Sequence, residues 1–144
     1  MTRIVAIEDD MLLGRMYSKK LEQAGYTIDL YDNGEKALAS IKKNPPVLVI
    51  SDVILPGMNG MEILENLKKN KATKKIPFVF LSNLSRSEED VRKGLELGAI
   101  AYLLKVEMTP EEIVAKIKEY IEAYSPNKVP ESAAARLDRA KKMS

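Results

Sequence analysis

Five short apolar runs, separated by segments with helical periodicity, constrain the fold of this chain more than any other feature. Continuous apolar runs of strand length are typical of strands that are covered on both faces. Strict alternation of strands and helices predicts a parallel sheet with helices on both sides. We therefore expect a doubly wound α/β fold with a five-stranded parallel sheet, for which the common strand order is 2-1-3-4-5. The predicted strands are Arg3–Ile7, Thr27–Tyr31, Val47–Ile50, Phe78–Leu81 and Ala101–Leu104.

The intervening segments carry apolar residues on one helical face and have recognisable ends. Gly25 is expected to end the first helix, and Pro45-Pro46 keeps helix out of the third strand. Thr109-Pro110-Glu111-Glu112 is the pattern of a capping box and begins the last helix, while Ser85 or Ser87 is expected to cap the fourth. The expected inward-facing residues are, helix by helix, Leu13, Tyr17, Leu21 and Ala24; Ala37, Leu38 and Ile41; Ile63, Leu64 and Leu67; Val91 and Leu95; and Ile113, Ile117, Ile121 and Tyr124.

The helical pattern ends at Tyr124, so residues 1–124 are expected to form one domain and residues 125–144 a linker with a basic tail. The tail has five basic residues against two acidic ones and has room for a short alanine-rich helix. Such a tail is too short for a DNA-binding domain. The sequence contains neither a signal peptide pattern nor an apolar run of membrane-spanning length, so we expect a cytoplasmic protein without a membrane span.

Composition restricts the chemistry that the chain can perform. The 144 residues include no histidine and no cysteine, which excludes imidazole and thiolate groups as bases, nucleophiles and metal ligands. The net charge of +2 favours neither nucleic acid nor membrane as the main partner. Any chemistry must therefore use carboxylates, hydroxyls and lysines, together with an oxygen-preferring cation such as Mg²⁺.

Polar side chains follow four of the five predicted strands. The first strand ends in Glu8-Asp9-Asp10, the third in Ser51-Asp52, the fourth in Ser82-Asn83, and Lys105 follows the fifth. Because the carboxyl ends of parallel strands meet at one edge of the sheet, we expect these side chains to lie close together, with Asp10 capping the first helix. Clustered carboxylates attract a divalent cation, and a lysine beside them supplies a charge for phosphate. The group suits phosphoryl transfer to a carboxylate nucleophile.

The sequence resembles the receiver domains of two-component response regulators over residues 3–124. The resemblance rests on Ile4–Asp10, on Asp52–Gly60, on Ser82 thirty residues after Asp52, and on Tyr102 three residues before Lys105. It implies the flavodoxin-like receiver fold. It also implies that the protein is a phosphoacceptor that promotes its own phosphorylation and slow dephosphorylation, and is not an enzyme acting on a separate substrate.

The resemblance assigns a role to each residue at the polar edge. Asp52 would accept the phosphoryl group, and Mg²⁺ would be held by the carboxylates of Glu8, Asp9 and Asp52 and by the backbone carbonyl of Ile54. Ser82 and Lys105 would bind the phosphoryl group. Tyr102 would act with Ser82 as a conformational switch.

The resemblance also implies partners. A histidine kinase or a histidine phosphotransfer protein would supply the phosphoryl group to a single-domain response regulator. Phosphorylation would then change the surface formed by the fourth helix, the fifth strand and the fifth helix, which would bind a downstream effector or a second copy of the chain.

Two departures from the family pattern keep an alternative open. Val106 follows Lys105 where the family usually has proline, so a trans peptide bond is expected there. Asn83 stands where the family usually has a small residue. These departures leave room for a receiver-like interaction module that is not phosphorylated. A dehalogenase-type phosphatase is disfavoured, because Ile54 stands where that class needs a second aspartate. A flavodoxin is disfavoured as well, because Asp9–Gly14 lacks the composition of a flavodoxin phosphate loop.

Overall fold

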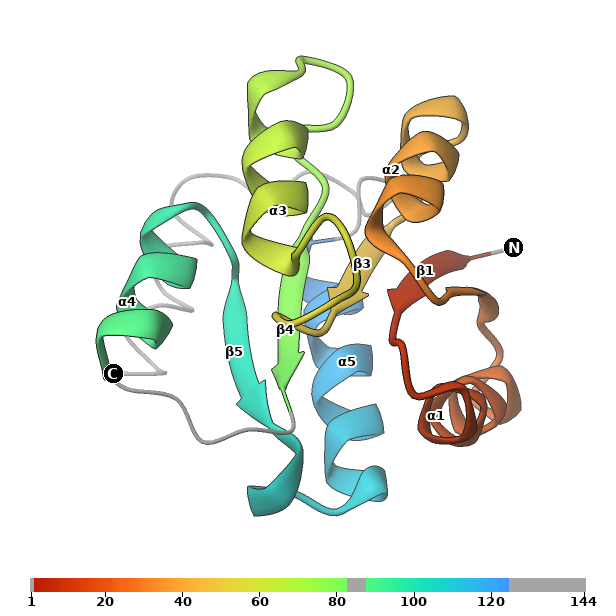
Figure 1. Ribbon diagram of the computed structural model, residues 1–144. Coiled ribbons are helices and arrows are strands. Elements are labelled where there is room, and N and C mark those ends of the chain that lie inside the picture. Colours follow the sequence, from red (N-terminus) through yellow and green to blue (C-terminus); the bar gives the residue numbers. More distant parts are fainter. Residues whose placement is uncertain (1, 83–87, 125–144) are drawn as a thin grey trace, which may run out of the picture.

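A five-stranded parallel sheet forms the centre of the molecule (Figure 1). The computed structural model describes residues 2–82 and 88–124. The strand order is β2-β1-β3-β4-β5 and every neighbouring pair is parallel, which confirms the predicted fold. The strands are β1 (Arg3–Ile7), β2 (Thr27–Tyr31), β3 (Leu48–Ser51), β4 (Phe78–Ser82) and β5 (Ala101–Leu104).

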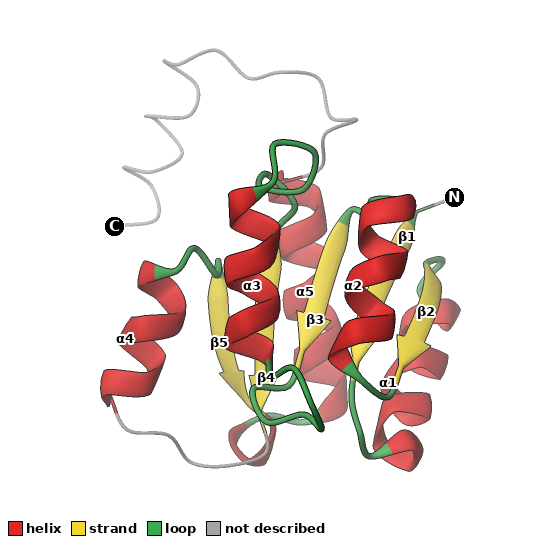
Figure 2. Ribbon diagram, turned by 45° about the horizontal axis from the view of Figure 1, so that its top comes forward, coloured by secondary structure: helices red, strands yellow, loops and turns green. Residues whose placement is uncertain are grey.

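Helices cover both faces of this sheet, as Figure 2 shows. In the described residues α1 and α5 pack on one face, and α2, α3 and α4 lie on the other. No helix within these residues is long and apolar enough to cross a membrane. The helices are α1 (Met11–Gln23), α2 (Gly34–Lys43), α3 (Gly60–Lys69), α4 (Glu88–Glu96) and α5 (Pro110–Tyr124), and the 3₁₀ turn η1 (Lys105–Glu107) follows β5.

Two apolar layers form the core, one on each face of the sheet. Phe78 and Phe80 pack in the layer beneath α2 and α3, while Ile117 packs with α1 in the other. The strands β3 and β4 are buried along their whole length, whereas β2 and β5 are only partly buried because they are edge strands. Helices cover both faces of the sheet as predicted, and the two edge strands are the least buried. The prediction of inward-facing helix residues is wrong for three positions, which are exposed: Ala24, Leu95 and Tyr124.

The predicted helix ends are confirmed where the structure describes them. The Asp10 side chain accepts a hydrogen bond from the backbone of Leu13 at the start of α1. Thr109 and Glu112 exchange side-chain and backbone hydrogen bonds at the start of α5, and Gly25 follows α1 with a φ of 101°. The predictions for Ser85, Ser87 and the tail from residue 125 onward fall outside the described residues.

A polar network that the sequence pattern did not predict ties β1, β2 and α2 together. Arg3 Nε donates to Asp29 Oδ2 at 2.7 Å, and Arg3 Nη2 donates to Ser40 Oγ at 2.6 Å. The Arg3 guanidinium also donates to the backbone oxygen of Asn44, and the Tyr31 hydroxyl donates to Ser40 Oγ at 2.7 Å. One guanidinium thus joins the outer strand, its neighbour and the helix that covers them.

Candidate functional site

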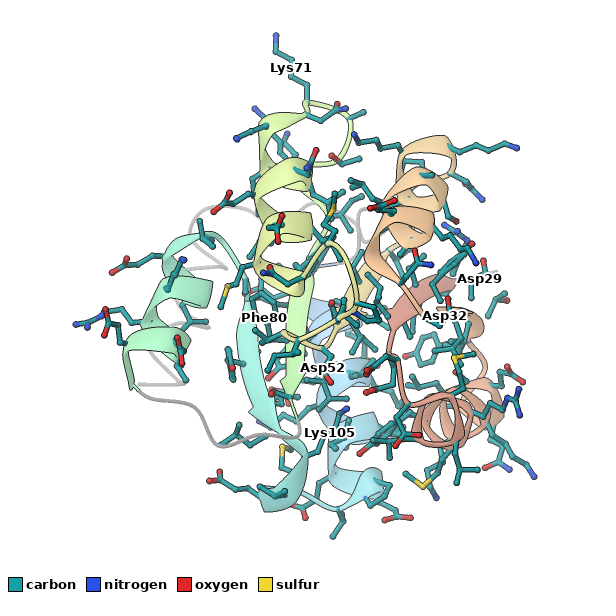
Figure 3. The ribbon with its side chains drawn as sticks, in the orientation of Figure 1. Asp29, Asp32, Asp52, Lys71, Phe80 and Lys105 are labelled. Carbon is teal, nitrogen blue, oxygen red and sulfur yellow. The ribbon has the colours of Figure 1, made fainter. Side chains whose placement is uncertain are left out.

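Three charged side chains from distant parts of the chain meet at the carboxyl edge of the sheet. Glu8 follows β1, Asp52 follows β3, and Lys105 follows β5. Each of these residues is only 8% exposed. Ionisable side chains are rarely buried to this extent unless they are paired with one another. Figure 3 shows Asp52 and Lys105 at this edge. The parallel strand order therefore brings them together as the sequence predicted.

The Lys105 ammonium lies between the two buried carboxylates. It donates to Glu8 Oε2 in direct contact and lies 3.5 Å from Asp52 Oδ2. Burial raises the pKa of the Glu8 carboxyl above its ordinary value, although the hydrogen bond from Lys105 acts in the opposite direction. The attraction between these charges is strong because little water reaches them, and the loss of hydration opposes it.

The two oxygens of the Asp52 carboxylate have different surroundings. Oδ1 accepts hydrogen bonds from the backbone N–H of Val53 at 2.7 Å and from that of Ile54 at 3.4 Å. Oδ2 faces the Lys105 ammonium. The backbone therefore fixes one oxygen and leaves the other towards the positive charge.

An acidic cluster is formed by Glu8, Asp9 and Asp52. One carboxylate oxygen from each residue lies within 4.8 Å of the others. Oxygen donors of this kind suit Mg²⁺, which binds through a few carboxylates and keeps several water ligands. The donor set thus fits the cation that the family implies. Asp10 is not part of this cluster, because its side chain caps α1.

The predicted switch residues lie on neighbouring strands. Ser82 ends β4 and is fully buried. Tyr102 lies opposite Phe80 in the β4–β5 register, and the centroids of their rings are 5.5 Å apart. Since residues two apart on a strand share a face, Phe80 links the positions of Ser82 and Tyr102 on one side of the sheet. Asn83 lies outside the described residues.

The loop after β5 carries the departure from the family pattern at Val106. The described residues contain no cis peptide bond, so the Lys105–Val106 bond is trans, as predicted. The Val106 side chain is 69% exposed. Lys105 reaches the acidic edge with this trans bond in place.

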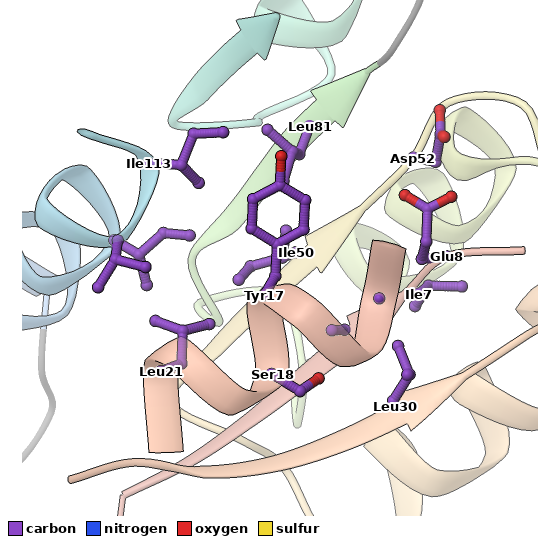
Figure 4. Close-up of a pocket in the computed structure, with 14 residues that line it drawn as sticks. Ile7, Glu8, Tyr17, Ser18, Leu21, Leu30, Ile50, Asp52, Leu81 and Ile113 are labelled. Atoms are coloured by element: carbon purple, nitrogen blue, oxygen red, sulfur yellow. The ribbon is translucent and has the colours of Figure 1, made fainter. Parts of the chain in front are cut away.

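A small pocket lies directly beside the site, between α1, α5 and the sheet (Figure 4). Its cavity has a volume of about 20 Å³ and mainly apolar walls, and the carboxylates of Glu8 and Asp52 lie at one side. Tyr17 lines it, and both burial and the charge of Glu8 raise the pKa of its phenol. The sequence analysis gave Tyr17 only a packing role, because helical periodicity does not show which side chain lies beside Glu8.

Gly60, the last residue of the Asp52–Gly60 stretch, packs directly against the site. A Cβ at this position would collide with the backbone oxygen of Asp52. The Gly60 N–H also donates to the backbone oxygen of Val53 at 2.8 Å. The start of α3 thus packs directly against the loop that carries Asp52.

The fold and this charged edge define a class of protein. The family model of the response regulator receiver domain matches residues 4–118, and the chain belongs to that family. It is therefore a receiver domain of two-component, phosphorylation-based signalling. The structure places the predicted residues at one edge, and their individual roles stay predictions.

Similar proteins agree with the family. The phosphate regulon transcriptional regulatory protein PhoB of Escherichia coli (strain K12) is 34% identical over 129 residues, which cover 90% of this chain and 56% of PhoB. The probable transcriptional regulator ycf29 of Pyropia yezoensis is 33% identical over 119 residues, covering 83% of this chain and 53% of that protein. The chain thus spans about half the length of these curated relatives.

Solved structures match over nearly their whole length. A putative response regulator from Chloroflexus aurantiacus is 31% identical with a TM-score of 0.76, and the match covers 83% of this chain and 97% of that one. The chemotaxis response regulator CheY4 of Vibrio cholerae is 29% identical with a TM-score of 0.75, covering 84% of this chain and 98% of that one. The described fold is thus that of a receiver domain.

Proposed function

We propose that the chain acts as a response regulator receiver that accepts a phosphoryl group on Asp52 from a histidine kinase or a histidine phosphotransfer protein. One observation carries the proposal: the nearly buried Asp52 carboxylate faces the Lys105 ammonium at 3.5 Å and shares an acidic cluster with Glu8 and Asp9. This phosphoryl transfer would take place in the cytoplasm, where such a kinase uses ATP.

Three residues have separate roles in the proposed phosphoryl transfer: Asp52, Lys105 and Val53. Asp52 Oδ2 attacks the phosphorus atom, so that a P–O bond forms while the P–N bond of the donor breaks and its electron pair stays on the imidazole. The Lys105 ammonium neutralises negative charge on the transferred group. The N–H of Val53 holds Oδ1 during the attack, which keeps the carboxylate in one orientation.

A divalent cation completes the proposed site. Glu8, Asp9, Asp52 and the carbonyl of Ile54 would hold Mg²⁺. When bound, the ion supplies further charge neutralisation for the phosphoryl oxygens. The chain gains and slowly loses its own phosphoryl group, and it is not proposed to turn over a separate substrate.

Phosphorylation would change a protein-binding surface. The Ser82 hydroxyl donates a hydrogen bond to the phosphoryl group, and Tyr102 responds through the strand pair that joins the two residues. The surface of α4, β5 and α5 then binds a downstream effector or a second copy of the chain. The partly buried edge strand β5 supports this choice of surface, because it lies beside Ser82 in the sheet register.

Phosphorylation of the purified chain tests the proposal. With acetyl phosphate and Mg²⁺, intact-mass spectrometry is expected to find one added phosphoryl group on the wild type and none on Asp52→Asn. Asp32→Asn removes an exposed aspartate and serves as the control that still gains the group. No gain by the wild type, or equal gain by Asp52→Asn, would reject the proposal and favour the unphosphorylated interaction module.

A further inference from the structure

Both oxygens of the Glu8 carboxylate already have partners within the protein. Oε2 accepts from the Lys105 ammonium, and Oε1 accepts from the backbone N–H of Asp10 at 3.2 Å. The Lys105 side chain is only 4% exposed, so water does not readily replace it. A cation that binds Glu8 must therefore bind a carboxylate whose charge Lys105 already neutralises.

The position of Lys105 makes it more than a general positive charge near the site. Its ammonium contacts Glu8 directly but lies 3.5 Å from Asp52. An ammonium and a divalent cation repel one another, and the repulsion is strong where little water screens it. The stronger the pair of Glu8 and Lys105, the weaker the binding of the cation.

We propose that Lys105 competes with the divalent cation for Glu8. The ion pair of Lys105 with Glu8 thereby lowers the cation affinity of the unphosphorylated protein. The inference rests on the cation site of the proposed function. An anionic group at Asp52 offers Lys105 a second acceptor and thereby weakens its hold on Glu8. By reciprocity, the phosphorylated protein binds the cation more tightly than the unphosphorylated protein does.

Cation titrations of neutral Lys105 variants test the competition. Binding of Mn²⁺, followed by electron paramagnetic resonance, is expected to be about tenfold tighter in Lys105→Met than in the wild type. In the Glu8→Gln background the same change should raise the affinity by a clearly smaller factor, because the contested carboxylate is gone and only the repulsion between the ammonium and the cation is relieved. Lys20→Met is the control: it removes the exposed pair of Lys20 with Glu111 and should leave the affinity unchanged.

A measurement on the wild type makes the test independent of how the variants fold. The ¹⁵N resonance of Lys105 Nζ is expected to shift in step with Mg²⁺ binding, since the ammonium changes its partner. An Nζ resonance that stays constant while Mg²⁺ binds would overturn the inference. So would a Lys105→Met variant, folded by circular dichroism, whose affinity equals that of the wild type or rises equally in the Glu8→Gln background. If the wild type itself binds neither cation, the cation site of the proposed function fails instead.

Discussion

Replacing Gly60 by alanine should disturb the phosphoacceptor loop more than the fold as a whole. The added methyl group would collide with the backbone oxygen of Asp52, and it would also lie 3.0 Å from Phe80 Cε1 and 3.2 Å from Val53 Cα. Two of these three neighbours are backbone atoms, so a side-chain rotation cannot relieve the contact. The loop or the start of α3 has to move.

The cost of this movement can be set against a matched glycine. Overpacking of this kind costs about 1–3 kcal/mol, and the better helix propensity of alanine returns at most about 1 kcal/mol. Gly25→Ala is the matched variant: nothing lies within 4 Å of its added methyl group, but a φ of 101° strains any residue with a Cβ by about 1–2 kcal/mol. Both variants should therefore lose a similar amount of stability.

Only the change at Gly60 should alter the chemistry. A displacement of Asp52 by a fraction of an ångström should slow phosphorylation by acetyl phosphate about tenfold or more, while Gly25→Ala should react at the wild-type rate. Urea unfolding gives the stabilities, and intact-mass time courses give the rates. The reasoning is refuted if the two variants react at equal rates.

Three further predictions concern other parts of the molecule. Arg3→Met removes the ion pair with Asp29 and the other bonds of the guanidinium, and should lower the free energy of unfolding by about 1–2 kcal/mol; an unchanged urea midpoint would contradict this. Burial raises the pKa of the Tyr120 phenol above 10.0, so above about pH 10 the unfolded chain releases this proton first and stability falls as pH rises. Tyr120→Phe should make the loss of stability between about pH 9 and pH 11 smaller, and an equal loss in both proteins would count against it. Ile54 lies two residues after Asp52 and cannot orient a hydrolytic water, so Ile54→Asn should lose its phosphoryl group several times faster than the wild type once the donor is removed; slower decay in the variant would exclude this role.

The sequence predicted the architecture because its local signals agree with one another. Alternating strand and helix patterns predicted a parallel sheet, and cap residues such as Asp10 and Thr109 marked where helices begin. The predictions of buried residues failed where periodicity alone does not determine burial. Leu95 has the spacing of an inward-facing residue, yet α4 leaves it 44% exposed.

The candidate site was predicted as a set of residues but not as a set of contacts. Strand ends showed that Glu8, Asp52 and Lys105 would meet, since parallel topology requires it. Sequence spacing cannot show which carboxylate a lysine prefers, because that choice depends on side-chain reach and burial. The network around Arg3 was missed for the same reason: it joins segments that are distant in the chain.

The unequal surroundings of the Asp52 oxygens have a stereochemical consequence. With Oδ1 tethered to the backbone, Oδ2 is the oxygen that faces the Lys105 ammonium, and under the proposed function it is the one that meets the incoming phosphorus atom. A group bonded to Oδ2 would leave the tether intact, and the modified side chain would keep the rotamer of the unmodified one. The loop would then enter the reaction already in the shape that the product needs.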